Sequence, residues 1–408
     1  MIPVCRQGKR CALVPISLAL IVLLSGCWNH NELNELSIVL AIGIDKMDDH
    51  HYEVSFQVVD PNQMSRTRSS DRTPTSVLSV REESISEALR KTAGMSSRKL
   101  YISHLQILFL DEATAKQGIN EPMDWLLRDY EIRPVFDLVI VRDHTAKDAL
   151  SFVTSTELLP AMDMHKALKL SYKSWAPTVY SRAKDFLESL SKDGIEPVIT
   201  GLQLGSQIDK AQTMDNVKKS TQHANYYYSG IGVFQEDHLV GWVNESEGRA
   251  YNYLTNHVVT SVNKIDCPDS NFQYTLEIID ANANLQPRVV NDKPVLEATI
   301  KIVSNIHEMG CNNIDLKKED DLLKLQKLAA DQYVETLNHG LQKAQSLGAD
   351  IFGFGEAFHR AYPAKWHEWK GDWDRRFQEM DVTVSVNLEI QRNGKIISSF
   401  GMKQNKQE

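Results

Sequence analysis

The sequence predicts an α+β protein in which mostly antiparallel or mixed β-sheets are flanked by α-helices. Segments with alternating apolar residues, such as 52–59 and 226–234, recur along the chain and favour strands. Segments with apolar residues at helical spacing lie between them, and the longest covers about 317–347. With 408 residues, 42% of them apolar, the chain is long enough for two or three domains with ordinary cores.

The first third is expected to follow the order β-β-α-β-α-β. Residues 36–45 and 52–59 are typical of a hairpin, and 61–75, rich in Ser, Thr and Arg, predicts a mobile loop. Ser79 and Glu82 have the spacing of a capping box for a helix that continues to Met95. The remaining elements expected here are strands at 105–110 and 136–141 and helices at 123–130 and from 145 onward.

The middle third is expected to be mainly helical over 145–192, with breaks at Pro160 and Pro177. A strand at 198–204 follows, and 207–225 is either a loop or a short helix. The later elements expected here are a hairpin formed by 226–234 and 239–243 and a helix or turn at 244–255.

The last third repeats strands and helices. Strands are expected at 258–264, 273–280 and 295–307, separated by turns rich in Asn, Asp and Pro. Gly348 is placed to end the long helix 317–347, and a shorter helix near 351–361 ends before Pro363. Residues 382–390 and 396–400 predict a closing hairpin because Asn393-Gly394 lies between them.

The amino terminus has the pattern of a lipoprotein leader. Basic residues precede an uncharged apolar run at 11–24, and Ser25-Gly26 then precede Cys27, as in a bacterial lipobox. We expect residues 1–26 to be a signal peptide and Cys27 to carry a diacylglyceryl group, which gives two chains for stable anchoring. An uncleaved membrane span is disfavoured because the run is shorter than about 20 residues and contains Pro15.

Charge and cysteine content restrict the class of function. The net charge of −9 becomes −12 once residues 1–26, with three basic and no acidic residues, are removed. Such acidity argues against nucleic acid as a partner and against binding of anionic lipid through the whole surface. Cys267 and Cys311 remain besides Cys27, and they are either a disulfide or two buried thiols.

No motif in the sequence supports catalysis or a cofactor. G-x-S-x-G, Walker A, H-E-x-x-H and C-x-x-C patterns are missing, and the glycine pairs 230–232 and 353–355 lack the third glycine of a dinucleotide loop. We interpret the first pair as a bulge or close packing within a strand, and the second as a close helix approach. Residues 48–51, Asp-Asp-His-His, are consecutive in a predicted turn, so a solvated turn is favoured over a metal site.

Three further groups could form contact surfaces. Trp366, Trp369, Trp373 and Phe377 recur at helical spacing, and packing onto the last sheet is favoured over an aromatic platform for a partner. In 226–228, Tyr-Tyr-Tyr, the outer two share a face and at least one is expected to pack inward. The arginines in the 61–75 loop could touch phosphate head groups, but simple solvation is favoured; these are Arg66, Arg68 and Arg72.

Taken in order, several motifs resemble a known family. They are Cys27-Trp28, Glu32-Leu33-Asn34-Glu35-Leu36, Ile42-Gly43-Ile44-Asp45, Gly230-Ile231-Gly232-Val233-Phe234, Leu239-Val240-Gly241-Trp242, and the run 347–355 followed by Pro363, Trp366, Trp373 and Phe377. This order is similar to that of the Ger(x)C family, the C-subunit lipoproteins of nutrient germinant receptors in endospore-forming bacteria. The segment after Trp242 departs from the family pattern, because Arg249-Ala250-Tyr251 follows Gly248.

The resemblance implies three domains, each a β-sheet flanked by helices, in an arrangement peculiar to the family. The boundaries expected are 27–144 for the amino-terminal domain, 145–256 for the middle domain and 257–408 for the carboxy-terminal domain. It implies a complex with two integral membrane subunits at the spore inner membrane, and no catalytic residues. A receptor subunit without enzymatic activity or cofactor is therefore expected, and the alternative is a solute-binding lipoprotein that captures a nutrient itself.

Overall fold

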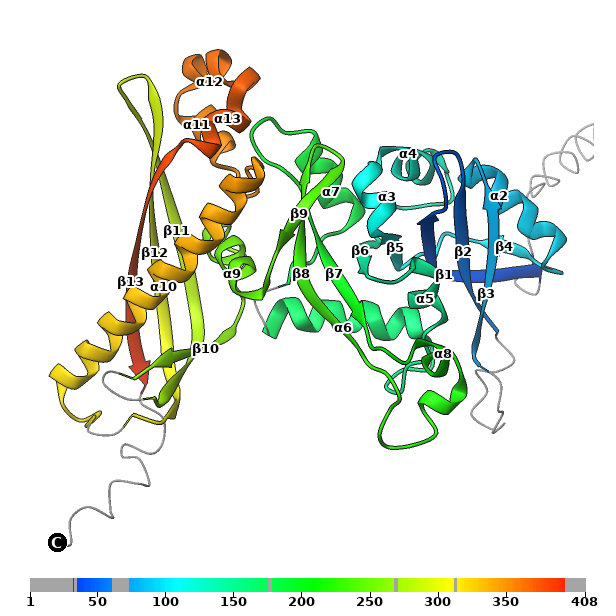
Figure 1. Ribbon diagram of the computed structural model, residues 1–408, viewed down its shortest axis with the longest axis horizontal. Coiled ribbons are helices and arrows are strands. Elements are labelled where there is room, and N and C mark those ends of the chain that lie inside the picture. Colours follow the sequence, from blue (N-terminus) through cyan, green and yellow to red (C-terminus); the bar gives the residue numbers. More distant parts are fainter. Residues whose placement is uncertain are drawn as a thin grey trace, which may run out of the picture.

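The computed structural model describes residues 32, 35–60, 73–174, 178–267, 271–311 and 314–392. Within them the chain forms two sheets, and Figure 1 shows these at opposite ends of an elongated molecule. Helices flank both sheets, so the expected α+β class is confirmed. Cys27, the arginines of the 61–75 loop and the expected strand 396–400 lie outside the described residues.

The first sheet has nine strands in the order β3-β2-β1-β5-β6-β7-β8-β9, with β4 paired to β1. Strands β1, β5, β6 and β7 are parallel to one another, and the strands beyond them on both sides pair antiparallel. Their bounds are β1 Leu36–Lys46, β2 Tyr52–Val59, β3 Thr75–Glu82, β4 Lys99–Tyr101, β5 Ile107–Asp111, β6 Asp137–Arg142, β7 Val198–Leu204, β8 Tyr226–Gln235 and β9 His238–Val243.

Helices cover both faces of this sheet, because its central strands are apolar on both sides. One face packs against α2 (Ile85–Lys91), α3 (Glu112–Gln117), α4 (Asn120–Arg128) and α7 (Ala183–Leu190). The other face packs against α5 (Ala146–Ser151), α6 (Pro160–Ser174) and α8 (Ile208–Ala211). A short 3₁₀ turn, η3 (Thr92–Gly94), follows α2, and another, η4 (Met214–Asn216), follows α8.

The second sheet contains β10 (Ser261–Asp266), β11 (Gln273–Val290), β12 (Lys293–Met309) and β13 (Asp381–Arg392), in that order. The long helix α10 (Glu319–Leu347) lies along one face, and its apolar residues from Leu325 to Ala344 join the core of the sheet. Gly348 ends α10 in the left-handed conformation, as predicted. Helix α9 (Glu245–Leu254) connects the two sheets and packs against α10.

A disulfide joins Cys267, just after β10, to Cys311, just after β12. The Cα atoms are 5.5 Å apart, which is an ordinary separation for such a bond. Of the two alternatives that the sequence left open, the structure therefore has the disulfide. It ties the end of β10 to the end of β12, on either side of the start of β11 in the second sheet.

The four aromatic residues from Trp366 to Phe377 are buried, with exposed fractions of at most 4%. Their predicted packing role is confirmed, since all four belong to the core of the second sheet. The expectation of a single helical face is wrong, because the segment is divided into α11 (Phe354–Ala361), α12 (Pro363–Trp369), η5 (Lys370–Asp372) and α13 (Trp373–Gln378). Gly371 lies at this division.

Several predicted boundaries also differ from the structure. Ser79 and Glu82 belong to β3 and pair with β2, so the capping box is wrong and the helix begins only at Ile85. Residues 152–159 interrupt the helical stretch, and Pro160 is the first residue of α6, where proline is tolerated in the first turn. The other break expected, at Pro177, lies outside the described residues. The boundary expected between 144 and 145 falls between β6 and α5, within the span of the first sheet. The three-domain division stays a prediction.

Candidate functional site

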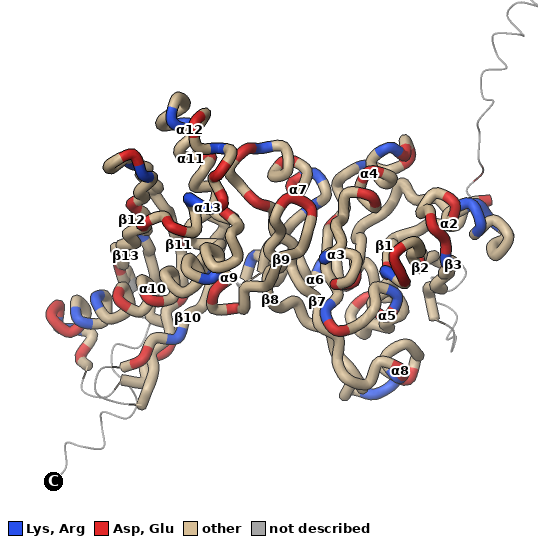
Figure 2. The backbone as a smooth tube through the Cα atoms, turned by 45° about the horizontal axis from the view of Figure 1, so that its top comes forward, with Lys and Arg blue, Asp and Glu red and all other residues tan. Residues whose placement is uncertain are grey.

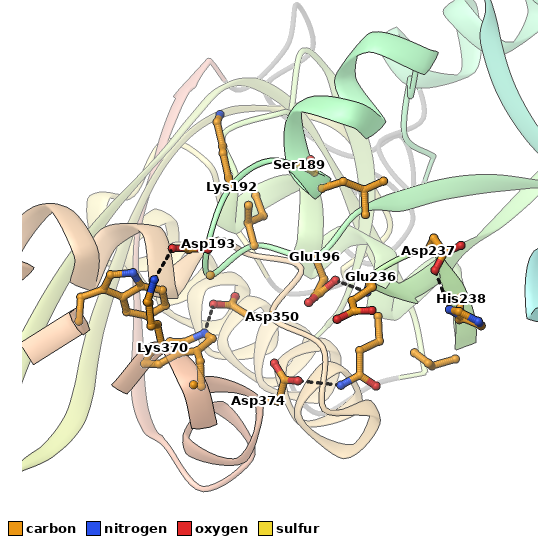
Figure 3. A pocket seen from close by; sticks show the side chains of 18 of the residues that line it. Ser189, Lys192, Asp193, Glu196, Glu236, Asp237, His238, Asp350, Lys370 and Asp374 are labelled. Carbon is orange, nitrogen blue, oxygen red and sulfur yellow. Dashed lines mark hydrogen bonds and ion pairs between the residues drawn. The ribbon is translucent and has the colours of Figure 1, made fainter. Parts of the chain in front are cut away.

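A polar cleft of about 790 Å³ lies where the two halves of the molecule meet. Three parts of the chain form its walls: the α7–β7 connection, the turn between β8 and β9, and the segment from Asp350 to Asp374. Figure 3 shows their charged side chains converging from these separate segments. Acidic side chains outnumber basic ones among the lining residues, which are Asp193, Glu196, Glu236, Asp237, Asp350 and Asp374 against Lys192 and Lys370.

Glycines bring the backbones together at the base of the cleft. A Cβ atom on Gly355 would lie 2.6 Å from the Cα of Gly194, a distance that real Cβ contacts do not reach. Gly194 has a φ of +81° and Gly353 has a φ of +72°, so both adopt a conformation that glycine favours. The predicted role of the 353–355 glycine pair as a close helix approach is therefore confirmed, and the neighbour is the α7–β7 connection.

Asp350 fixes the start of α11 at this joint. Its carboxylate accepts hydrogen bonds from the backbone N–H groups of Phe354 and Gly355 and from the indole Nε1 of Trp373, at 2.7–3.1 Å. Burial raises the pKa of the carboxyl to about 6, although these hydrogen bonds favour the charged form. The side chain that fixes the local geometry is thus also a titratable group at the cleft.

Glu196 bridges the two halves. Its backbone N–H donates to the carbonyl of Asp350 at 2.8 Å, and its Oε2 accepts from the backbone N–H of Glu236 at 2.7 Å. Burial, together with the nearby carboxylates of Asp374, Asp350 and Glu236, raises the pKa of the Glu196 carboxyl to about 7. Glu196 is therefore the cleft side chain whose charge changes near neutral pH.

The β8–β9 turn receives contacts from two other elements. Gln235 donates its Nε2 to Asp374 of α13 at 2.8 Å. The carboxylate of Asp237 accepts from the backbone N–H of Asn120 in α4 at 3.0 Å and pairs with His238 at 2.8 Å. The turn is consequently the point at which the first sheet, α4 and the carboxy-terminal helices are held together.

Chemically, the cleft is suited to holding segments together and to accepting a small polar or cationic molecule. Most of its carboxylates already accept hydrogen bonds from this chain. Within the described ranges, no group of three or more His, Cys, Asp or Glu side chains has the arrangement of a metal site. Sequence motifs pointed to the glycines here, but Glu196 and Asp374 carried no signal because their partners are distant in the chain.

The other residues that the sequence singled out have structural roles. Asp48 accepts hydrogen bonds from the backbone of His50 and His51, so residues 48–51 form the expected solvated turn. Tyr228 is buried and Tyr227 is exposed, as the alternation predicted. Gly230, with a φ of +74°, lies next to a register shift between β7 and β8, which confirms the bulge.

Comparison with known proteins agrees with the order of motifs in the sequence. The family model described as "Spore germination protein N-terminal domain" matches residues 29–204. A second, described as "Spore germination B3/ GerAC like, C-terminal", matches residues 229–394. The chain belongs to the Ger(x)C family of spore germination proteins.

Relatives in Bacillus subtilis (strain 168) match over almost their whole length. Spore germination protein KC is 26% identical over 393 residues, which cover 95% of this chain and 96% of that protein. Spore germination protein B3 is 22% identical over 373 residues, covering 91% and 95%. The crystal structure of the GerBC protein has a TM-score of 0.55 at 18% identity, covers 86% of this chain and 96% of that chain, and shows the same fold.

Proposed function

We propose that this protein is a lipid-anchored, non-enzymatic subunit of a nutrient germinant receptor that takes part in triggering spore germination. The observation that carries the proposal is the matching of both family models, in order, over 29–204 and 229–394. Relatives named as spore germination proteins extend over more than nine-tenths of the chain. The resemblance therefore covers the whole body of the protein.

Cys27 is proposed as the site of lipid attachment. It follows a leader of the lipobox type and precedes β1, which begins at Leu36, by only nine residues. No helix in the part of the chain that the structure describes has the length and apolarity to cross a membrane. We infer that the anchor holds the body at the extracytoplasmic face of the spore inner membrane.

The absence of enzymatic activity is part of the proposal, and the cleft supports it through the roles of its carboxylates. Asp350 holds the start of α11, Asp374 holds Gln235, and Glu196 holds the β8–β9 turn. A catalytic carboxylate needs a free position for substrate, whereas these groups are engaged with the chain itself. Their arrangement fits a joint that transmits force or position between the two halves.

Two integral membrane subunits are the proposed partners. The test is photo-crosslinking in spores from probes placed on exposed residues of each half, followed by identification of the crosslinked protein. The proposal expects membrane-embedded receptor subunits to be captured from at least one half. Mass spectrometry of the amino-terminal peptide should find a diacylglyceryl group on Cys27, and an unmodified cysteine in the membrane fraction would contradict the anchor.

A second candidate function is direct capture of a nutrient in the cleft. The observation in its favour is the size of the cleft, about 790 Å³, which is enough for a small polar molecule. Calorimetry with a panel of amino acids, sugars and nucleosides separates the two candidates. Stoichiometric binding that Asp374→Asn weakens would favour capture, whereas no heat with any nutrient would favour the subunit that only transmits the signal.

A further inference from the structure

The end of the molecule that carries α2 and β4 is where the described chain begins. Strand β4 pairs in parallel with the first residues of β1, so Lys99 lies beside Leu36 and Leu100 beside Ser37. In Figure 1 this end lies farthest from the second sheet. From Cys27 to Leu36 there are nine residues, which span at most about 30 Å when extended. A membrane that holds Cys27 is therefore within reach of this end.

Residues 90–99 at this end carry four basic side chains and no acidic one, although the whole chain has a net charge of −9. Lys91 pairs with Glu82, and Lys99 pairs with Glu131. Arg90 and Arg98, in contrast, have no ion pair within the described residues. Figure 2 shows basic and acidic residues side by side around α2 at this end.

Exposed apolar and aromatic side chains accompany these arginines. Met95, in the turn between α2 and β4, is 53% exposed, and Tyr130, after α4, is 86% exposed. A hollow of about 590 Å³ between α2 and α4 is lined by Arg90, Arg98 and Tyr130. The hydroxyls of Ser86 and Ser97 also line it, whereas those of Thr92 and Ser96 donate to backbone carbonyls. Two carboxylates complete the lining, and of these Glu131 pairs with Lys99 and Asp129 accepts from the backbone N–H of Glu131. Guanidinium donors beside an exposed tyrosine suit phosphate groups at a membrane interface.

We propose that Arg90, Met95, Arg98 and Tyr130 form a docking face for an anionic phospholipid surface, with the arginines on lipid phosphates and Met95 inserted among the head groups. This inference rests on the proposed lipid anchor at Cys27, which places the face beside the membrane. A basic patch supplies a second attachment besides the acyl chains, because basic residues near an anionic surface are attracted to it. Docking would fix the orientation of the body relative to the membrane.

The test uses the lipidated chain, purified from membranes and reconstituted into vesicles that contain brominated lipid as a fluorescence quencher. A fluorophore is attached at Met95→Cys in one sample and at Val290→Cys in another. Val290 is 48% exposed at the tip of the β11–β12 hairpin, in the second sheet. Vesicles of phosphatidylcholine alone are compared with vesicles that also contain phosphatidylglycerol.

We expect the label at position 95 to be quenched in anionic vesicles, less in neutral ones, and the label at position 290 to be quenched in neither. Substitution of both arginines, Arg90→Gln with Arg98→Gln, should weaken the quenching at position 95 roughly tenfold or more. The control is Lys324→Gln with Lys327→Gln, which removes the same charge from exposed positions on α10 and should leave the quenching unchanged.

The outcomes separate the docking face from the anchor. A chain that floats with both kinds of vesicle but shows no quenching at position 95 has the anchor and overturns the docking face. Equal quenching before and after the arginine substitutions also overturns it. A chain that floats with neither vesicle contradicts the anchor and the docking face together. If the fluorophore at position 95 is instead shielded from solvent only when receptor subunits are present, the face binds protein and the lipid proposal is wrong.

Discussion

Gly194 and Gly355 lie backbone against backbone, so that a Cβ atom on either glycine would come within 2.7 Å of backbone atoms of the other. The contact joins the α7–β7 connection of the first half to the start of α11 in the second half. It explains why the motif at 353–355 contains glycine where no cofactor loop exists.

Gly355→Ala is expected to destabilise the joint. The added methyl group would overlap Gly194 and the indole of Trp373, and overpacking of this kind costs about 1–3 kcal/mol. Denaturant unfolding measures the change. The matched control is Gly371→Ala, because a Cβ atom there has no neighbour within 4 Å. Equal stability of the Gly355→Ala variant and the parent would show that the two halves do not pack as described.

Removal of the disulfide by Cys267→Ser with Cys311→Ser should lower the free energy of unfolding by about 2–4 kcal/mol. The bond closes a segment of 44 residues, and the unfolded chain gains conformational entropy when it is cut. Thermal unfolding with and without reductant provides the measurement. Reductant should lower the Tm of the parent and leave that of the double variant unchanged. A lower Tm for both proteins would show that reductant acts through something other than this disulfide.

Stability at the cleft should depend on pH through Glu196. Its folded pKa of about 7 lies above the ordinary glutamate value of 4.5, so the proton stabilises the folded state. This contribution is fully present below about pH 4.5, falls as the pH rises toward 7, and is absent above it. Because Glu196 is partly exposed, we expect its protonation to contribute about 1–2 kcal/mol to the free energy of unfolding.

Urea midpoints measured between pH 4.5 and 7.5 test this dependence. Glu196→Gln should reduce the slope of stability against pH, because the amide does not titrate. Some slope should remain, since burial also raises the pKa of Asp350 to about 6 and of Asp45 to about 7. Asp193→Asn removes an exposed carboxyl from the same cleft without being one of the groups that raise the pKa of Glu196, and it is the control. Identical slopes for the parent and Glu196→Gln would exclude this assignment.

Asp45→Ala should destabilise the first sheet by about 1–2 kcal/mol. The carboxylate of Asp45 accepts hydrogen bonds from the backbone N–H groups of Ala146 and Lys147 at the start of α5. Asp45→Asn retains an acceptor oxygen, so its loss should be smaller. Denaturant unfolding of both variants gives the comparison, and a larger loss for Asn than for Ala would be inconsistent with a role in capping α5.

How much of the fold the sequence could predict depended on whether local pattern and tertiary pairing agreed. The strand at 198–204 and the hairpin 226–243 were predicted closely, because alternation and turn residues there match the pairing. Strand β11 was expected to end near Asp280, yet it continues to Val290 through residues rich in Asn. Continuous pairing with β12 outweighs the low strand propensity of those residues, whose polar side chains face solvent.

The cleft could not be predicted, because its residues come from separate segments, and even Glu196 and Glu236 are 40 positions apart. Gln235 and Asp374 are separated by 139 residues, and neither belongs to a pattern that local spacing reveals. Likewise, β3 resembled the start of a helix through Ser79 and Glu82, and only its pairing with β2 decides the matter. The glycines were the exception, since close backbone contacts require that residue type.

As the proposed lipid-anchored receptor subunit, this protein should be needed for the response of spores to a nutrient. The most direct measurement is the germination rate of spores, nutrient by nutrient, for the parent strain, a strain lacking the gene, and a strain carrying Cys27→Ala. We predict that the deletion abolishes the response to at least one nutrient, that Cys27→Ala impairs the same response, and that vegetative growth is unchanged. Normal germination of the deletion strain on every nutrient tested would contradict the account.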